Sequence, residues 1–153
     1  MAYITLDRSK LKSNYIFLEK LFNTQKVDWS IVTKVLCGHK EYISEILNLG
    51  IKQICDSRVY NLKAVKSINP DIETIYIKPP AKRAIKGIIK YADVSINTHI
   101  STVELLSQEA KKVGKSHKVI IMVELGELRE GVLRDKLIEF YGRVHTLDNI
   151  EVI

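Results

Sequence analysis

Short apolar runs alternate with amphipathic helical segments along the whole chain, and this alternation restricts the fold more than any other feature. The apolar runs are nearly continuous, which is typical of strands in a parallel sheet that is covered on both faces. Helices between such strands supply the crossovers that parallel pairing requires. The pattern therefore predicts an α/β fold, with a parallel sheet and helices outside it.

The predicted elements follow one another without a linker. Five strand–helix units come after a first helix, and a sixth strand begins at the end of the sequence. The first predicted strand lies within 29–39 and stops at Gly38, and the others are 52–55, 74–77, 94–96, 119–123 and 150–153. The predicted helices are 8–24, 41–48, 59–68, 83–91, 101–113 and 133–147. A short extended segment, 3–6, precedes the first helix. Asp7 is its expected cap, and Ser101 with Glu104 three residues later has the sequence of a capping box.

The composition excludes several classes of protein. The chain has 153 residues, of which 46% are hydrophobic and 27% are charged, as in ordinary soluble globular proteins. No apolar run approaches the roughly 18 residues of a membrane span, and residues 1–7 lack the layout of a signal peptide. Because Cys37 and Cys55 are the only cysteines and no export signal precedes them, we expect a cytoplasmic protein without a disulfide or a membrane partner.

The net charge of +6 raises the question of a nucleic-acid partner. The basic residues are scattered, and the densest group, Lys82, Arg83, Lys86 and Lys90, has the spacing of a solvated helix face. No aromatic residues interleave with them and no binding motif is recognisable. The charge pattern therefore does not favour binding to nucleic acid.

Lys34 stands inside the first apolar run, which extends from Trp29 toward His39 and stops at Gly38. Burial in a parallel sheet removes water from an ammonium group and favours the neutral amine. A neutral amine is the form that reacts with an aldehyde to give an imine. The alternative is a lysine whose aliphatic stem follows the strand while its charged end reaches water.

Polar residues gather directly after the predicted strands. In a parallel α/β fold these carboxyl ends meet at one edge, where active sites lie. The alternative is that such loops are polar only because they face solvent and cap helices. The polar positions are Gly38-His39, Asp56-Ser57-Arg58, Lys78, Asn97-Thr98-His99 and the segment from Glu124 to Arg129.

Arg58 and Arg129 each lie in a loop after a predicted buried strand. A guanidinium group there can hold a phenolate, carboxylate or phosphate by paired hydrogen bonds, and the alternative role is a salt bridge to a neighbouring helix. Cys37 and Cys55 are expected to be small buried residues rather than nucleophiles, because no motif pairs either with a base.

The four histidines do not suggest a metal site. His39 and His99 are expected at the carboxyl edge, His117 at the opposite end and His145 in the last helix. No pair has the spacing of metal ligands, so no metal is expected.

Four motifs resemble a known family when they are taken in order. They are Val32-Thr33-Lys34-Val35-Leu36-Cys37-Gly38, Asp56-Ser57-Arg58 with Asn61-Leu62, Tyr91-Ala92-Asp93-Val94-Ser95-Ile96-Asn97, and Met122-Val123-Glu124-Leu125-Gly126-Glu127-Leu128-Arg129-Glu130-Gly131. Together they are similar to the N-terminal barrel of the alanine-racemase-like, fold-type III pyridoxal-phosphate enzymes. Within that family they most resemble the ornithine and amino-acid racemases, and the resemblance covers essentially the whole chain.

The resemblance implies a cofactor, pyridoxal 5'-phosphate, and a set of residues that bind it. Lys34 would form the internal aldimine with the cofactor and exchange the α-proton of a small amino-acid substrate. Arg129 matches the arginine that reaches toward the cofactor's phenolic oxygen, and further cofactor contacts are expected at Asn97 and Arg58.

The chain departs from the family pattern at three places. Lys78 stands before Pro79-Pro80, where the family has an arginine before an isoleucine-proline pair. Thr98-His99 stands where a glutamate commonly occurs, and no tyrosine lies between Lys34 and Lys40. These positions concern the substrate contacts more than the cofactor bond.

The resemblance implies a TIM-type (βα) barrel, and an eight-unit barrel takes about 250 residues. Residues 1–153 are therefore expected to be the N-terminal part of such a barrel, with the remaining units and a second domain absent. The unpaired edge at 150–153 is expected to associate with a second copy, as a homodimer, or with the missing half.

Three functions stay open at this point. The first is a pyridoxal-phosphate-dependent racemase whose site is incomplete in these residues. The second is a carrier of the same barrel type that binds the cofactor without turnover. The third is a half-barrel assembly module with no cofactor.

Overall fold

The computed structural model describes residues 5–153, and its elements confirm the predicted alternation. The strands are β1 (Ile31–Val32), β2 (Gln53–Asp56), β3 (Glu73–Tyr76), β4 (Val94–Asn97), β5 (His117–Ile121) and β6 (Ile150–Val152). The helices are α1 (Arg8–Thr24), α2 (Lys40–Leu47), α3 (Val59–Ile68), α4 (Ile85–Tyr91), α5 (Ile100–Lys112) and α6 (Leu137–His145). Short 3₁₀ turns are η1 (Lys34–Leu36), η2 (Lys82–Ala84) and η3 (Arg134–Lys136).

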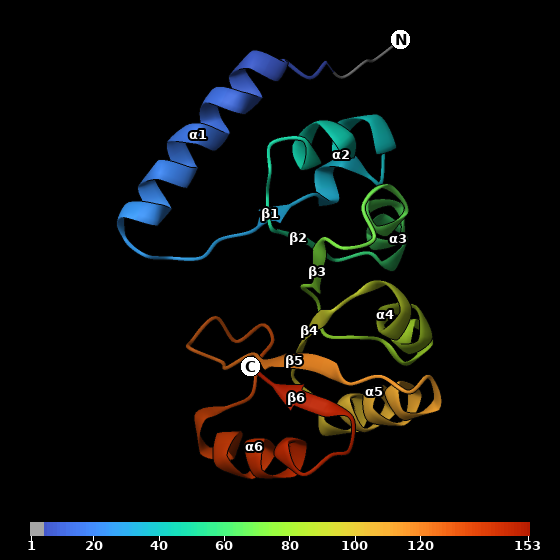
Figure 1. The fold of residues 1–153 in the computed structure, drawn as a ribbon. Coiled ribbons are helices and arrows are strands. Elements are labelled where there is room, and N and C mark those ends of the chain that lie inside the picture. Colours follow the sequence, from blue (N-terminus) through green and yellow to red (C-terminus); the bar gives the residue numbers. More distant parts are fainter. Residues whose placement is uncertain (1–4) are drawn as a thin grey trace.

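All six strands form one parallel sheet in the order β1-β2-β3-β4-β5-β6. Each strand pairs with the next one in the sequence, so each crossover helix advances the sheet by one strand. Figure 1 shows the strands in that succession, with α2 to α5 on one side of them. Successive parallel strands with helices on one side form the wall of a (βα) barrel, and six of the eight strands of a full barrel are present. The fold is therefore an incomplete TIM-type barrel, as expected.

The helices and the sheet enclose two apolar clusters. One contains Leu62, Ile88, Leu106 and Val119, which are fully buried, and the other is centred on Ile54. Each such side chain contributes on the order of 1.5–3 kcal/mol to folding when it is removed from water. The amphipathic spacing read from the sequence is what places these residues on the inner face of each helix.

The opposite face of the sheet carries a separate, smaller cluster. Cys55, Ile75 and Val94 are neighbours on adjacent strands, since Cys55 pairs with Ile75 and Ile75 pairs with Val94. Ile77 and Ile120 pack against them, and no helix residue belongs to this group. In a closed barrel this face lines the interior.

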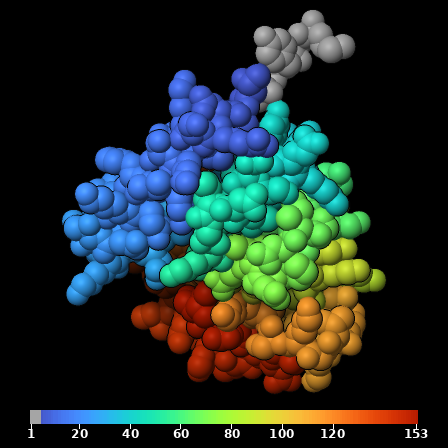
Figure 2. Space-filling model, turned by 45° about the horizontal axis from the view of Figure 1, so that its top comes forward, coloured from blue at the N-terminus to red at the C-terminus, as the bar shows by residue number. Residues whose placement is uncertain are grey.

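Helix α1 lies outside the wall of strands. Its first turn is capped as predicted, because Asp7 Oδ1 accepts a 3.0 Å hydrogen bond from the backbone N–H of Lys10. The helix contains no buried residue. Figure 2 shows it along one side of the molecule, next to the segment that contains α2, and an ion pair of 2.7 Å between Arg8 and Glu45 joins the two helices.

Two local predictions were wrong or lie partly outside the described residues. The capping box at Ser101 is absent, because α5 begins at Ile100 with His99 as its N-cap. Glu104 instead binds the Arg143 guanidinium at 3.1 Å. Of the extended segment 3–6, residues 3 and 4 lie outside the described residues, and 5 and 6 form no strand.

No helix among residues 5–153 combines the length and apolar character that crossing a membrane requires.

Candidate active site at the carboxyl ends of the strands

Lys34 lies directly beyond the end of β1 and not inside a strand. Strand β1 is only two residues long, and Lys34 opens the 3₁₀ turn η1 with its side chain exposed. The turn closes at Cys37, whose backbone is left-handed with φ of 50°. The expectation that a buried strand would desolvate Lys34 is therefore wrong for this chain, and the side chain stands instead at the carboxyl edge of the sheet.

The turn is tied to the end of β2 by Thr33. The backbone N–H of Thr33 donates to Cys55 O at 3.0 Å, which is the last ladder bond between the two strands. The Thr33 hydroxyl donates to Asp56 Oδ2 at 3.0 Å, and both residues are buried. The residue immediately before Lys34 is thus fixed to the neighbouring strand.

Asp56 is a fully buried carboxylate whose two oxygens are both occupied. Besides the Thr33 hydroxyl, Asp56 accepts hydrogen bonds from Asn61 Nδ2 at 3.1 Å (Oδ1) and 3.0 Å (Oδ2). Its Oδ1 also accepts a bond of 2.9 Å from the backbone N–H of Arg58. A buried carboxylate without such partners would be strongly unfavourable.

Arg58 and Lys34 are brought to the same place on the edge. The Arg58 side chain is exposed, and its Nη1 lies 3.5 Å from Cys37 Sγ. Cys37 Sγ in turn lies 3.7 Å from the backbone oxygen of Lys34. Cys37 is exposed, so its predicted burial is wrong, whereas Cys55 is buried as expected.

Asn97 ends β4 at the same edge, but its side chain is fully buried. Its Nδ2 donates to the backbone oxygen of Ser95 at 2.8 Å and to Ser95 Oγ at 3.0 Å. Its Oδ1 has no partner among residues 5–153. In this arrangement the amide group is not open to a bound molecule, so the expected contact between Asn97 and the cofactor stays a prediction.

Arg129 is exposed on a loop that follows β5. Glu124 organises this loop, because its Oε1 accepts bonds from the backbone N–H groups of Leu128 at 2.9 Å and Gly126 at 2.7 Å. These bonds hold the pKa of Glu124 below its usual range. Within residues 5–153 the Arg129 guanidinium forms no hydrogen bond or ion pair, and it is not joined to Lys34 or Arg58.

Apart from the Cys37 thiol, the exposed ionisable groups in the loops after the first four strands are basic. Asp56 is the carboxylate among these positions, and it is buried and fully bonded. The exposed residues are Lys34, His39, Arg58, Lys78 and His99. This edge can therefore attract an anionic group and present a primary amine to it.

The sequence did not reveal how Asp56 and Thr33 act together. Both belong to motifs that the sequence singles out, but the apolar pattern contains no sign that one binds the other. One sequence signal could have indicated a buried acceptor. Asp56 ends an apolar run, and Asn61 follows five residues later in the first turn of the next helix.

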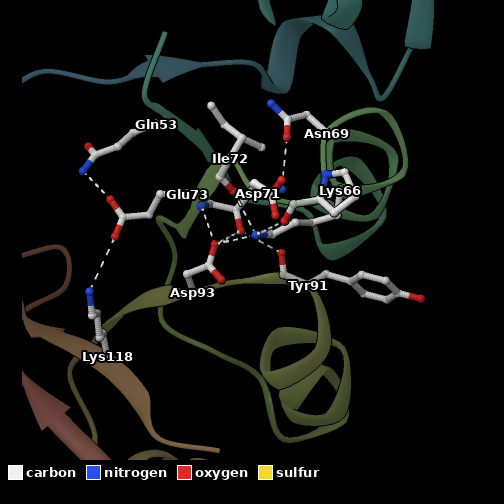
Figure 3. A network of polar contacts seen from close by, with 11 residues as sticks. Gln53, Lys66, Asn69, Asp71, Ile72, Glu73, Tyr91, Asp93 and Lys118 are labelled. Carbon is white, nitrogen blue, oxygen red and sulfur yellow. Dashed lines mark hydrogen bonds and ion pairs between the residues drawn. The ribbon is translucent and has the colours of Figure 1, made fainter.

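The amino ends of the strands carry a second polar region, on the opposite side from Lys34. Figure 3 shows it as a network in which Lys66 Nζ lies 2.7 Å from Asp93 Oδ2, and Glu73 binds Gln53 and, at 3.8 Å, Lys118. Burial alone would raise the pKa of Asp93, but hydrogen bonds from Lys66 and Thr74 outweigh it and hold that pKa below the usual value.

A cavity of about 430 Å³ adjoins this network. It is lined by residues at the amino ends of β3 to β6, including His117. His117 lies at the end opposite the carboxyl edge, as expected, and it is also buried, with Ser95 Oγ 2.9 Å from its Nε2. The ion pairs here join α3 to the residue before β4 and β3 to β5, so they hold parts of this protein together at the end of the sheet opposite Lys34.

Comparison with known families identifies one match that covers nearly the whole chain. Residues 6–153 match the family model described as alanine racemase, N-terminal domain. An ornithine racemase from Acetoanaerobium sticklandii is 33% identical over 150 residues, which are 97% of this chain. The chain spans 42% of the length of that relative.

Solved structures share the fold at low sequence identity. A D-threonine aldolase from Filomicrobium marinum superposes with a TM-score of 0.81 over 96% of this chain and 41% of its own, at 15% identity. PipY from Synechococcus elongatus PCC7942, solved with PLP bound, superposes with a TM-score of 0.66 over 74% of this chain and 57% of its own, at 18% identity. At these identities the likeness shows the barrel fold alone.

Proposed function

The chain belongs to the family of the alanine racemase N-terminal domain, and we propose that it forms the Lys34-bearing part of a pyridoxal-phosphate-dependent amino-acid racemase. The observation that carries this proposal is the position of Lys34. Its amine is exposed at the carboxyl edge of a partial barrel, and among residues 5–153 it is engaged in no hydrogen bond or ion pair.

The residues at this edge fit the chemistry of pyridoxal phosphate. The cofactor has an aldehyde, which reacts with a primary amine, and a phosphate and a phenolate, which favour cationic partners. Lys34 supplies the amine, and the exposed guanidinium of Arg58 stands next to the same turn. Arg129, on the loop after β5, is the proposed partner of the phenolic oxygen, and Asn97 is retained as a proposed contact that requires a change in its side chain.

Each group of this chain has a defined task in the proposed reaction. When bound, pyridoxal phosphate acts as an electron sink that makes the α-hydrogen of an amino acid acidic. Lys34 Nζ takes that proton from one face and can return it. Arg58 and Arg129 hold negative charge in place, and the exposed basic edge attracts the substrate carboxylate. Ornithine is the proposed substrate, on the strength of the relative at 33% identity.

The domain organisation is also a proposal. We propose that residues 1–153 are the N-terminal part of the barrel, and that further strands and a second domain supply the opposite-face base. The outer edges of β1 and β6 pair with no other strand of the described residues, so these edges are the proposed sites of association with a second copy or with the remaining strands. We also propose that the protein is cytoplasmic.

Covalent trapping tests the assignment of Lys34. The purified protein is incubated with pyridoxal phosphate, the bound cofactor is reduced with borohydride, and the labelled peptide is identified by mass spectrometry. We expect the label on Lys34 and its loss in Lys34→Ala. The control is Lys78→Ala, since Lys78 is an exposed lysine just beyond β3, and this variant should keep the label. A Lys34→Ala variant that still binds the cofactor covalently would contradict the assignment.

A non-catalytic cofactor carrier is the second candidate function. It is supported by the barrel fold shared with PipY, which was solved with PLP bound. Incubation of L-ornithine with the longer protein proposed above, followed by chiral chromatography, distinguishes a racemase from a carrier. A racemase produces D-ornithine in amounts that grow with time, whereas a carrier that binds the cofactor without turnover leaves the L-ornithine unchanged.

A further inference from the structure

One buried polar cluster, formed by Thr33, Asp56 and Asn61, binds the start of the turn that carries Lys34 and packs against its end. Asp56 binds the Thr33 hydroxyl immediately before Lys34. Asn61 binds both oxygens of Asp56 through Nδ2. A Cβ atom added to Gly38 would lie 3.1 Å from Asn61 Oδ1, so the same amide also packs against the end of the turn. The cluster therefore spans the segment from which Lys34 projects.

Burial restricts what this cluster can do. Thr33 and Asn61 are each 1% exposed, and Asp56 is 0% exposed. All of the hydrogen bonds that Asp56 accepts come from the protein itself, so its carboxylate faces neither solvent nor a bound molecule. A charge-assisted hydrogen bond in such surroundings is stronger than one in water, and it restrains the groups that it joins.

We propose that Asp56 is a positioning residue, which fixes the backbone before Lys34 through the Thr33 hydroxyl and so sets the direction of the Lys34 amine. Asp56 also accepts from the backbone N–H of Arg58. The same carboxylate thus sets the relative positions of the amine and the neighbouring guanidinium. The proposal rests on the proposed function of Lys34 and adds the group that orients it.

A purely structural role is the alternative, and the chain contains a matched control for it. Thr74 is 0% exposed, and its hydroxyl lies 3.0 Å from Asp93 Oδ2 and 2.9 Å from Tyr91 O, either of which can accept its proton. The Thr33 hydroxyl donates to Asp56 Oδ2 at 3.0 Å. Both threonines are buried and both place a hydroxyl on an aspartate oxygen, but Thr74 lies at the amino ends of the strands. Its partner Asp93 is exposed and paired with Lys66, whereas Asp56 is buried without a cation. Thr74→Val therefore controls for the removal of a buried threonine hydroxyl, and only the loss at Thr33 should affect Lys34.

Thr33→Val is the test variant, because it keeps the shape of the side chain and removes one bond. Replacing Asp56 itself would leave several buried donors without an acceptor and endanger folding. Thr33→Ser restores the hydroxyl, and Thr74→Val is the control. The first measurement is the affinity for pyridoxal phosphate together with the rate of borohydride labelling at Lys34. The second is hydrogen exchange at the amides of Leu36 and Cys37, which donate to Thr33 O and Lys34 O.

We expect Thr33→Val to weaken cofactor binding about tenfold, which is the size of one buried hydrogen bond to a charged group. Exchange at the two amides should become at least about tenfold faster. Thr33→Ser should restore both quantities, and Thr74→Val should change neither. Equal effects of the two valine variants, or a Thr33→Val variant that behaves like the parent protein, would overturn the proposal.

The design separates this proposal from the proposed function. If the parent protein labels at Lys34 and Thr33→Val does not alter the labelling, positioning by Asp56 fails while the cofactor assignment stands. If the parent protein, completed by the further barrel strands that the proposal assigns to it, never labels at Lys34, the proposed function fails. The exchange measurement then still decides whether Asp56 orders the turn, because it does not depend on the cofactor.

Discussion

Gly131 lies so close to Glu124 that no side chain can replace its hydrogen. A Cβ atom on Gly131 would stand 2.6 Å from the backbone nitrogen and 2.8 Å from the Cα of Glu124. Gly131 also has a φ of 141°, which L-residues rarely adopt. This contact closes the loop that carries Arg129, together with a hydrogen bond of 2.9 Å from Glu124 N to Val132 O.

Gly131→Ala is therefore expected to open the Arg129 loop and destabilise the protein by about 1–3 kcal/mol. Urea unfolding followed by circular dichroism measures the change. Gly142→Ala is the matched control, because Gly142 lies in α6 with no atom within 4 Å of the added carbon. It should stabilise the protein by roughly 0.5–1 kcal/mol, since alanine favours the helix. If Gly131→Ala were as stable as the parent protein, the close contact between Gly131 and the Glu124 backbone would be contradicted.

Acid should destabilise the protein through His117. Burial lowers the pKa of His117 from 6.5 to about 4, and the negative charge of Asp93 opposes only part of this shift. Between these two pH values the unfolded chain binds a proton that the folded chain does not, so stability falls as the pH falls. One such group corresponds to a loss on the order of 3 kcal/mol across the window.

His117→Gln should remove most of this dependence of the unfolding free energy on pH between pH 6.5 and pH 4. Chemical denaturation at several pH values measures it, and His145→Gln, which replaces an exposed histidine of α6, is the control. Below about pH 4, a further loss of folding stability, due to Asp93, is expected in both the parent protein and His117→Gln. The pKa of Asp93 is depressed when folded, so its contribution is present above its ordinary value of 3.8 and disappears as the pH falls below it. An unchanged slope in His117→Gln would refute the role of His117.

Helix α1 should detach before the rest of the protein unfolds. It has no buried residue, and Trp29, the single tryptophan, contacts it. Trp29 Nε1 donates to Glu19 Oε2 at 2.9 Å, and its ring lies 5.4 Å from that of Phe22. Tryptophan fluorescence should therefore change at a lower urea concentration than the far-ultraviolet signal of the barrel.

Phe22→Ala should move the fluorescence transition to still lower urea and leave the main transition in place, because the aromatic contact is local to α1. Phe17→Ala serves as the comparison, since Phe17 is 66% exposed on the same helix, and it should shift neither transition. Coincident fluorescence and far-ultraviolet midpoints in the parent protein would show that α1 and the barrel unfold together.

The two cysteines should differ in their reactivity toward a thiol reagent. Cys37 is exposed beside Arg58, whereas Cys55 is buried. Burial raises the pKa of the Cys55 thiol, and its hydrogen bond with Ser30 opposes only part of that effect. Near neutral pH the Cys37 thiol should react at least about tenfold faster than the Cys55 thiol. Cys37→Ser should abolish the fast phase, and a fast phase that persists would assign it to Cys55.

The sequence alone determined the α/β class, the number of strands and helices, and the edge at which the polar residues gather. Helix 8–24 and helix 59–68 were predicted with the bounds that α1 and α3 have. These features depend on residues three or four positions apart, and on the order of units in a parallel sheet, so they are local in the sequence.

Only the tertiary structure decided the surroundings of Lys34 and Asp56. The two residues looked alike in the sequence, as charged groups at the end of apolar runs, but one is exposed and the other is fully buried. Asp56 is satisfied by Thr33, 23 residues earlier, and by Asn61 on the following helix. Burial of a charge depends on partners supplied by neighbouring elements, and the pattern of one strand does not contain them.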